Sequence, residues 1–346
     1  MQDSMEISQE NTGHNGGGEP ALKQIKLSVL VPVYKSEATI GDLVDTVVEK
    51  LSPHINLWEI ILVNDGSPDN SHACILEVME RHPGLIKYVR LYRNFGEHNA
   101  DMAGLNHLTG DCVAIIDDDF QNPPTEILAL VRKMIEGDYD VVYSYYARKK
   151  HSWFRNFGSM VNDRVASVLL KKPRKLYLSS FKVVRADLVR FICQYRGPYP
   201  YIDGLILRST NRIGTQLVQH ETRKEGKSGY TLAKLINLWL NMSTGFSVTP
   251  LRVVALIGFA LSGLAMLMAA AFILEGASAH YLQQFLPPGW ASTITTITLF
   301  AGLQMSVLGI MGEYLGRLFL TINGEPQFLI RETYGVEDSE REREAI

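Results

Sequence analysis

The sequence predicts an α/β domain with a mostly parallel sheet, followed by helices that cross a membrane. Between residue 25 and about residue 150, near-continuous apolar segments alternate with amphipathic ones. This alternation is typical of parallel strands whose two faces are covered by helices. Further along the chain, residues 253–274 and 276–312 contain no Asp, Glu, Lys or Arg. A helix of 22 residues is about 33 Å long, which is enough to cross a hydrocarbon core of about 30 Å.

The expected elements follow one another as strand and helix along the first half of the chain. Apolar runs predict strands at 28–34, 59–65, 88–94, 112–119 and 140–146. Helical patterns between them predict helices at 40–51, 72–82 and 98–110. In such sheets ligands bind beyond the carboxyl ends of the strands. Polar clusters lie at those ends, at 32–34, 65–67, 93–94 and 117–119.

Composition excludes several other classes of protein. The 346 residues carry a net charge of −3, so we expect no nucleic-acid partner, which would require a basic surface. The three cysteines include no C-x-x-C pair, which argues against a disulfide scaffold or a zinc ribbon. Residues 1–24 are polar and lack an apolar core, so we expect a disordered segment and no signal peptide.

Charges at the ends of the apolar segments predict the topology. We place the transmembrane helices at 250–275 and 291–312; two buried helices of a soluble protein are the alternative. Arg252 precedes the first span, Arg317 follows the second, and the loop between them has no Lys or Arg. The positive-inside rule therefore puts the N-terminal α/β domain, the C-terminal segment 313–346 and both termini in the cytosol, in a multi-pass protein of the cytoplasmic membrane.

A short amphipathic helix is expected at 231–247, directly before the first span. Apolar side chains recur there every three to four residues, at Leu232, Leu235, Ile236, Trp239, Met242 and Phe246. Such a helix lies in the membrane interface and would hold the domain against the lipid headgroups. The alternative is a helix that packs against the α/β domain.

Three consecutive acids after the fourth strand give the clearest chemical signal. Alternation along an extended chain would point Asp117 and Asp119 to one side and Asp118 to the other. Together with the amide oxygen of Gln121, Asp117 and Asp119 offer oxygen ligands suited to Mg²⁺ or Mn²⁺. The alternative is a solvated acidic turn that caps the next helix.

Several motifs together resemble those of the inverting glycosyltransferases of family 2, and among them the polyprenyl-phosphate glycosyltransferases. The motifs are VPVY (31–34), VNDGSPDNS (63–71), RNFGEHNADMAG (93–104), TGD (109–111), DDDFQNPP (117–124), SWFR (152–155), YTLAKLINL (230–238), TPLR (249–252) and GEYLGR (312–317). The resemblance covers roughly residues 26–330. It implies the nucleotide-sugar-binding fold called GT-A over residues 25–230.

The resemblance also implies a role for each matching position. Nucleotide-sugar binding would involve Pro32, Tyr34, Glu37, Asp65, Gly66, Asn94, Asp117 and Asp118. The metal would be held by Asp117, Asp119 and Gln121. The phosphate of the acceptor would contact Arg148, Lys149, Arg155, Ser159, Arg223 and Ser228. The chain departs from the family pattern at Lys35–Ser36, at Asp118, and at Leu176, where the family often has an aspartate.

The acceptor implied by the resemblance is a polyprenyl phosphate, with undecaprenyl phosphate the expected one. A phosphate monoester is mostly dianionic at pH 7 and needs no base to attack a sugar. We therefore expect catalysis to depend on positioning and charge, through Asp119 and Arg155, with in-line attack and inversion. Asp203 is a candidate for binding sugar hydroxyls or, alternatively, for the role of base; it could instead be the N-cap of a helix.

The expected function is transfer of a sugar from a nucleotide-diphosphate sugar to a polyprenyl phosphate, for modification of cell-envelope glycans. A membrane-anchored nucleotide-sugar-binding protein or a polysaccharide synthase component is the alternative. A processive synthase would have a Q-x-x-R-W motif, and none of the four tryptophans lies in one. The glycine-containing spans offer little packing of their own, which is compatible with a homo-oligomer.

Overall fold

The computed structural model describes residues 22–146, 176–197, 199–218 and 290–336, with scattered positions between 251 and 267. The segment 1–21, the expected interfacial helix at 231–247 and most of the first expected span lie outside the described residues. Leu22, which we expected in the disordered segment, is buried in the core.

The described domain is built on one sheet of eight strands in the order β7-β5-β6-β4-β1-β2-β3-β8. Its strands are β1 (Lys26–Val33), β2 (Leu57–Asn64), β3 (Ile86–Leu91), β4 (Cys112–Ile115), β5 (Val141–Tyr146), β6 (Lys182–Arg185), β7 (Ile213–Val218) and β8 (Ile330–Tyr334). The central pairs β1–β2, β1–β4 and β2–β3 are parallel, as is β5–β7. Only β6 and β8 run antiparallel to their neighbours, which confirms the prediction of a mostly parallel sheet.

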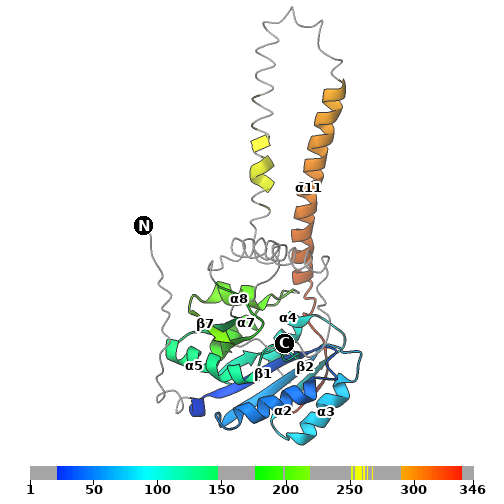
Figure 1. Ribbon diagram of the computed structural model, residues 1–346. Helices are drawn as coiled ribbons and strands as arrows, with labels where there is room; N and C mark the ends of the chain where they lie inside the picture. Colours follow the sequence, from blue (N-terminus) through cyan, green and yellow to red (C-terminus); the bar gives the residue numbers. More distant parts are fainter. Residues whose placement is uncertain are drawn as a thin grey trace, which may run out of the picture.

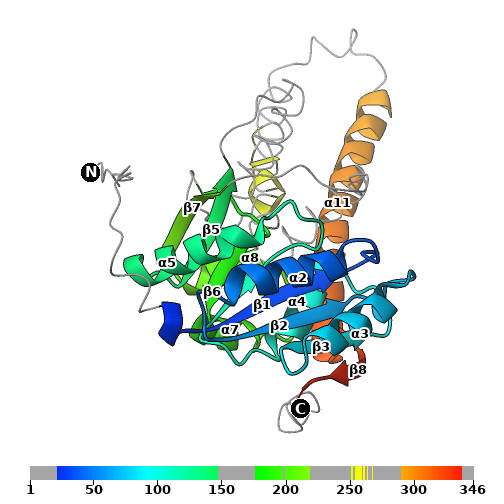
Figure 2. The ribbon, with the colours of Figure 1, turned by 60° about the horizontal axis from the view of Figure 1, so that its bottom comes forward.

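Helices cover both faces of this sheet (Figure 2). One apolar core packs α2 (Ile40–Leu51), α3 (Ser71–Arg81) and α5 (Ile127–Gly137) on one face. A second core packs α4 (Glu97–Leu105), α7 (Ala186–Ile192) and α8 (Ile202–Ser209) on the other. A 3₁₀ turn, η1 (Pro124–Glu126), precedes α5.

The expected strands and helices of the first half are present, but three of them end several residues earlier than predicted: β3 ends at Leu91 rather than 94, α4 at Leu105 rather than 110, and β4 at Ile115. Helix α2 has the predicted bounds because its buried residues recur at helical spacing. Strand β4 is only four residues long and ends at Ile115, whereas we expected it to run to Asp119. The three acids therefore lie in a loop, and the alternation of an extended chain does not set their directions.

A long helix, α11 (Trp290–Ile322), extends away from the sheet domain (Figure 1). Among the described residues, one stretch is long and apolar enough to cross a membrane, Phe300–Ile322. The helix continues well past residue 312, where we expected the span to end. Arg317 bonds to Glu313 one turn earlier at 2.9 Å, so the two charges are accommodated within the helix.

After α11 the chain returns to the sheet, which the sequence did not lead us to expect. Strand β8 pairs with the edge strand β3, and the amide of Tyr92 donates to the carbonyl of Leu329 at 3.0 Å. The Gln327 side chain donates to the carbonyls of Tyr195 and Gly197 at 2.7 and 2.9 Å. Residues 330–334 are therefore part of the sheet domain rather than a separate C-terminal segment.

Candidate active site

The loops that follow β1, β2 and β4 meet at the carboxyl edge of the sheet. Asp118 joins the first and third of these loops, because its carboxylate accepts hydrogen bonds from the amide of Tyr34 at 3.1 Å and from the Ser36 hydroxyl. Burial, together with the charges of Asp117 and Asp119, raises the pKa of Asp118 to about 6, although the two hydrogen bonds lower it. The middle acid thus holds the acidic loop against the end of β1.

The loops after β1 and β2 are joined by their own hydrogen bonds. The Glu37 carboxylate accepts from the amide of Asn70 at 2.8 Å, and the amide of Lys35 donates to the Ser67 hydroxyl at 3.2 Å. Pro32 lies inside β1, so the expected nucleotide-binding segment 32–37 begins within the sheet and ends in this loop contact. Tyr34 is exposed.

Asp65 and Gly66 form a tight corner at the end of β2. Both Asp65 oxygens accept backbone hydrogen bonds, from Phe95 at 2.7 Å and Gly96 at 2.9 Å. Burial raises the pKa of this carboxyl despite the two hydrogen bonds. The corner therefore fixes the loop after β3, in which Asn94 is exposed.

Asp117 and Asp119 lie close enough for their charges to interact. Asp117 accepts hydrogen bonds from the Asn122 amide at 2.8 Å and the Ser180 hydroxyl at 2.6 Å. Burial raises the pKa of Asp117, and the charge of Asp119 raises it further. The Asp119 carboxylate accepts a hydrogen bond from the backbone N–H of Gln121 at 3.0 Å.

The oxygen atoms of Asp117, Asp119 and Gln121 fit part of a metal site. The negative charges of Asp117 and Asp119 repel each other, and a bound cation would relieve this repulsion. Oxygen is the ligand that Mg²⁺ and Mn²⁺ prefer. Within the described ranges, no cluster of three His, Cys, Asp or Glu side chains is placed to hold a metal. Asp117, Asp119 and Gln121 would therefore supply only part of a coordination shell, and water and ligand oxygens would complete it.

Asp203 lies in the first turn of α8, where Tyr201 is the N-cap, so it does not cap the helix. Its carboxylate accepts hydrogen bonds from the Lys182 ammonium at 2.5 Å and the Tyr143 hydroxyl at 2.9 Å. Burial lowers the pKa of Lys182, but the charge and hydrogen bond of Asp203, together with the charges of Asp101 and Glu97, outweigh burial and leave that pKa raised. An aspartate held in a buried ion pair is poorly suited to act as a base.

Sequence reasoning missed the polar residues that line the α4 side of this site. Strand β6 begins at Lys182, and Ser180 comes two residues before it. Helix α4 carries Glu97, His98 and Asp101. Asp101 is 3% exposed, and burial raises its pKa well above the ordinary value. One signal was visible, since Asp101 interrupts a run of small and apolar residues, ADMAG.

All six residues expected to contact the acceptor phosphate lie outside the described residues: Arg148, Lys149, Arg155, Ser159, Arg223 and Ser228. Their roles remain predictions from the sequence.

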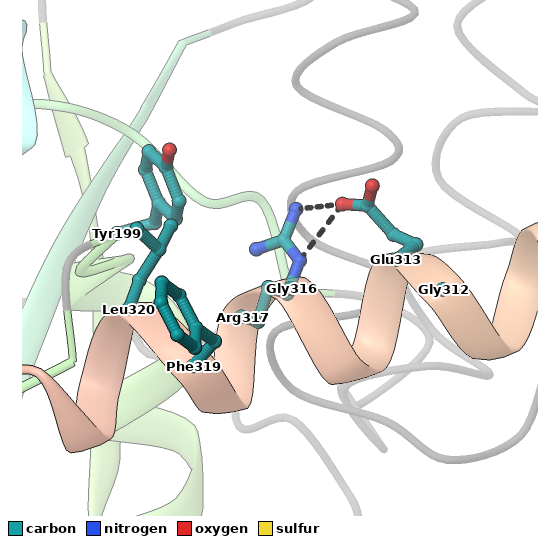
Figure 3. Close-up of a pocket in the computed structure, with 7 residues that line it drawn as sticks. All are labelled: Tyr199, Gly312, Glu313, Gly316, Arg317, Phe319 and Leu320. Carbon is teal, nitrogen blue, oxygen red and sulfur yellow. Dashed lines mark hydrogen bonds and ion pairs between the residues drawn. The ribbon is translucent and has the colours of Figure 1, made fainter.

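A pocket of about 420 Å³ lies where α11 meets the sheet domain (Figure 3). Its described lining consists of Tyr199, Gly312, Glu313, Gly316, Arg317, Phe319 and Leu320. The Arg317 guanidinium lies 5.2 Å from the centre of the Tyr199 ring and bonds to Glu313. This side chain is only 14% exposed. The pocket therefore combines an apolar helix surface with one nearly buried arginine.

A family model and the named relatives of this chain both point to the same family of glycosyltransferases. The model of glycosyl transferase family 2 matches residues 28–193. The undecaprenyl-phosphate 4-deoxy-4-formamido-L-arabinose transferase of Serratia proteamaculans is 32% identical over 92% of this chain and 97% of its own. The proteins of the same name from Edwardsiella ictaluri and Yersinia pestis are 32% and 30% identical, with the same coverage.

Solved structures show lower similarity. Glucosyl-3-phosphoglycerate synthase from Mycobacterium tuberculosis, in complex with Mn²⁺, UDP-glucose and phosphoglyceric acid, is 20% identical with a TM-score of 0.48, covering 68% of this chain and 82% of its own. TarS of S. aureus is 21% identical with a TM-score of 0.39, covering 56% and 58%.

Proposed function

The chain belongs to glycosyl transferase family 2, and we propose that it transfers a sugar, with inversion, from a nucleotide-diphosphate sugar to undecaprenyl phosphate. The observation that carries the proposal is the contact between the acidic loop and the end of β1 through Asp118. This contact brings carboxylates and backbone amides together at the edge of the sheet where α/β proteins bind ligands. The relatives named above support the choice of acceptor.

The donor would lie across the ends of β1, β2 and β4. Segment 32–37 and the corner at Asp65–Gly66 would hold the base and ribose, next to the exposed Tyr34 and Asn94. The hydrogen bonds that join these loops support a preformed site, because little backbone order must then be gained on binding.

A divalent cation, Mg²⁺ or Mn²⁺, would be held by Asp117, Asp119 and Gln121. When bound, such a cation neutralises charge on a diphosphate leaving group. The protein's own contribution is to hold the two carboxylates in place. Ser180 and the Asn122 side chain donate hydrogen bonds to Asp117, and the backbone N–H of Gln121 donates one to Asp119.

The acceptor needs no proton removed, since its phosphate is already mostly dianionic at pH 7. The pairing of Asp203 with Lys182 supports a mechanism without an aspartate base at this position. Arg148, Lys149, Arg155, Ser159, Arg223 and Ser228 would bind and orient the acceptor phosphate. Arginine suits this task because its planar fork matches phosphate oxygens.

Helix α11 supports a membrane location, where a polyprenyl phosphate is found. Many of its apolar side chains are exposed, including Met305, Leu308, Leu315 and Leu318. Exposed apolar surface on this scale indicates contact with lipid or with another protein. The pocket around Arg317 lies at the base of this helix, so the lipid chain could follow α11 to the sheet domain.

Chain connectivity supports two crossings rather than one. Because β8 pairs with β3, residues 330–334 lie on the same side of the membrane as the catalytic strands. If α11 crosses the membrane, Trp290 lies on the opposite side. The chain between Val218 and Trp290 must then cross an odd number of times, and the charge-free segment 253–274 can provide that crossing.

The proposal is tested by supplying the full chain in detergent with undecaprenyl phosphate, Mg²⁺ or Mn²⁺, and a panel of nucleotide-diphosphate sugars. We expect one donor to give undecaprenyl-phosphate sugar, identified by its mass. Binding of a donor without hydrolysis and without any lipid product would favour the alternative of a protein that only binds nucleotide sugars.

Asp119→Ala tests the metal assignment. Because the variant removes one of two carboxylates expected to hold the cation, transfer should fall at least 100-fold, the scale typical of lost charge stabilisation. Asp140→Asn, at the amino end of β5, is the matched control and should keep most activity. Wild-type turnover by Asp119→Ala at saturating Mg²⁺ would contradict the assignment.

A further inference from the structure

Tyr88 on β3 carries a buried hydroxyl that the site described above does not use. Its side chain is fully buried, and burial raises the pKa of Tyr88 to about 12, so the hydroxyl keeps its hydrogen at physiological pH. The Tyr334 ring from β8 stacks on the Tyr88 ring, with the ring centres 5.6 Å apart and an angle of 14° between the planes. The backbone of β3 and the ring from β8 together fix the place of this hydroxyl.

The Tyr88 hydroxyl bridges two polar side chains. Its oxygen accepts a hydrogen bond from the side-chain amide of Asn64, the last residue of β2, at 3.2 Å. The same oxygen lies 2.9 Å from Nδ1 of His72 on α3. Burial, together with the charge of Arg90, lowers the pKa of His72, so the ring is neutral at pH 7 and its Nδ1 can accept the hydroxyl hydrogen. The hydroxyl is therefore engaged both as an acceptor and as a donor.

Asn64 connects this hydroxyl to the corner at Asp65–Gly66. Its side chain is 1% exposed, and its amide oxygen accepts the backbone N–H of Ser67 at 2.8 Å. Within the described ranges, the Tyr88 oxygen is the one hydrogen-bond partner of the Asn64 amide nitrogen. Without that oxygen the buried amide nitrogen would lose its partner, which costs more than an ordinary hydrogen bond contributes. The Asn64 side chain would then have to shift, and the Ser67 N–H with it.

Ser67 joins the corner to the end of β1. Its hydroxyl accepts the backbone N–H of Lys35 at 3.2 Å and donates to the carbonyl oxygen of Val33 at 3.4 Å. The backbone N–H of Asp65 donates to the same carbonyl oxygen at 3.0 Å. A continuous series of hydrogen bonds therefore runs from the Tyr88 hydroxyl to the end of β1.

We propose that Tyr88 is a positioning residue of the donor site, whose hydroxyl holds Asn64 so that the Asp65–Gly66 corner and the end of β1 keep the spacing that binds a nucleoside diphosphate. This inference rests on the proposed function, because these two segments are taken to hold the base and ribose. Tyr88 is fully buried, so it acts through Asn64 and does not touch the nucleotide. A corner that loses this support must be ordered on binding, which weakens the affinity.

Two variants interrupt the series of hydrogen bonds at different points. Tyr88→Phe removes the hydroxyl and keeps the ring, and Asn64→Ala removes the side chain through which the hydroxyl acts. Tyr334→Phe is the matched control, because it takes a hydroxyl from the other ring of the same stack. Ile55→Val is a control for a small loss of stability, since Ile55 is buried at the opposite edge of the sheet, two residues before β2 begins.

Nucleotide binding is measured on the full chain in detergent with Mn²⁺. UDP, GDP, ADP and CDP are first compared on the wild-type protein, and the one that binds most tightly is then used with every variant. The Tm of each variant is recorded alongside, so that affinity and stability are compared on the same samples.

Tyr88→Phe should raise the Kd of the nucleoside diphosphate about three- to tenfold, the scale of one lost hydrogen bond. Asn64→Ala should raise it at least as much. The double variant should bind no more weakly than Asn64→Ala alone, because Tyr88 acts through Asn64. Tyr334→Phe and Ile55→Val should stay within about twofold of the wild-type Kd, even where their Tm falls as far as that of Tyr88→Phe.

An unchanged Kd in Tyr88→Phe, or additive losses in the double variant, would overturn the inference. So would an equal loss of affinity in Ile55→Val, which would show that the effect follows stability alone. If Tyr88→Phe gives no folded protein, an unchanged Kd in Asn64→Ala still decides against the inference. In each of these cases nucleotide binding by the wild type leaves the proposed function standing. Failure of the wild type to bind any of the four nucleotides would overturn the proposed function as well.

Discussion

Gly66 occupies a position where both the backbone angle and the surroundings require glycine. Its φ is +61°, and an added Cβ would lie 2.3 Å from the carbonyl carbon of Arg93. Backbone cannot move aside as a flexible side chain can, so the corner would have to open. The loop that carries Asn94 and leads into α4 would shift with it.

Gly66→Ala should therefore cost about 2–4 kcal/mol of folding free energy, a large effect for one methyl group. Gly84→Ala is the matched control, because its φ of +78° is equally unfavourable but nothing lies within 4 Å of an added Cβ. It should cost about 1 kcal/mol. Thermal unfolding of the full chain in detergent should show a markedly lower Tm for Gly66→Ala than for Gly84→Ala. Equal values would contradict the steric explanation.

His98 is a second residue whose surroundings decide its chemistry. Burial lowers its pKa to about 4, with Lys182 acting in the same direction and Asp203 opposing. Its ring packs edge-on against Tyr201 at 5.1 Å, and Nδ1 has no hydrogen-bond partner within the described residues. The folded protein therefore holds this histidine neutral.

The pH dependence of stability follows from that shift. The folded pKa lies below the model value of 6.5, so stability is fully present above pH 6.5 and is lost as the pH falls toward 4. The loss should reach about 3 kcal/mol, at about 1.4 kcal/mol for each unit. His98→Phe keeps the ring contact, so its Tm should fall less than that of the wild type between pH 7 and pH 4.5. Parallel Tm profiles would show that His98 is not the group responsible.

At the scale of elements, the edge of the sheet near β8 was the least predictable part. The ring of Tyr334 stacks on that of Tyr88 at 5.6 Å, and Arg90 bonds to Glu332 at 3.2 Å. Without β8, strand β3 would expose an unpaired edge, which favours aggregation. The C-terminal strand therefore completes the sheet and protects it.

Tyr334→Ala should lower folding stability by about 2 kcal/mol, because it removes a stacked aromatic pair and leaves a gap beside Tyr88. Arg331→Ala, at an exposed position of the same strand, should have little effect. Differential scanning fluorimetry of the two variants makes the comparison. A similar Tm for both would mean that β8 contributes little through this contact.

The short strand β4 shows how an element can be recognised while its end is misjudged. Residues 112–115 are buried in a central position between β1 and β6, as their apolar character predicts. The acids after them leave the sheet because they bond to other loops, Asp118 to Tyr34 and Asp117 to Ser180. Those partners come from 84 and 63 residues away, so no local pattern reveals them.

At the scale of the whole molecule, the return of the chain to the sheet makes membrane topology testable. The variant for this purpose has Cys74, Cys112 and Cys193 replaced by alanine, and carries one new cysteine at Asn323 or at Gln283. Two crossings place Asn323 in the cytosol and Gln283 outside. A membrane-impermeant thiol reagent applied to intact cells should then label Gln283→Cys alone, and Asn323→Cys only after the membrane is opened. Labelling of both in intact cells would contradict the topology.

The sequence by itself determined the alternation of strands and helices, the position of the acids at strand ends and the charge-free segments. These features depend on local periodicity and composition, which a strand or helix carries within its own residues. It also carried the family motifs, so the class of reaction could be predicted before any geometry was known.

Only the tertiary structure decided which distant groups meet: Lys182 with Asp203, Asp65 with the Gly96 amide, and β8 with β3. The physical reason is that the entropy of closing a loop grows slowly with its length. By this scaling, bringing together partners 242 residues apart, as in Arg90–Glu332, costs only about 2 kcal/mol more than bringing together partners 30 residues apart. Side-chain fit and burial select among such partners. Fit and burial exist only once the chain has folded.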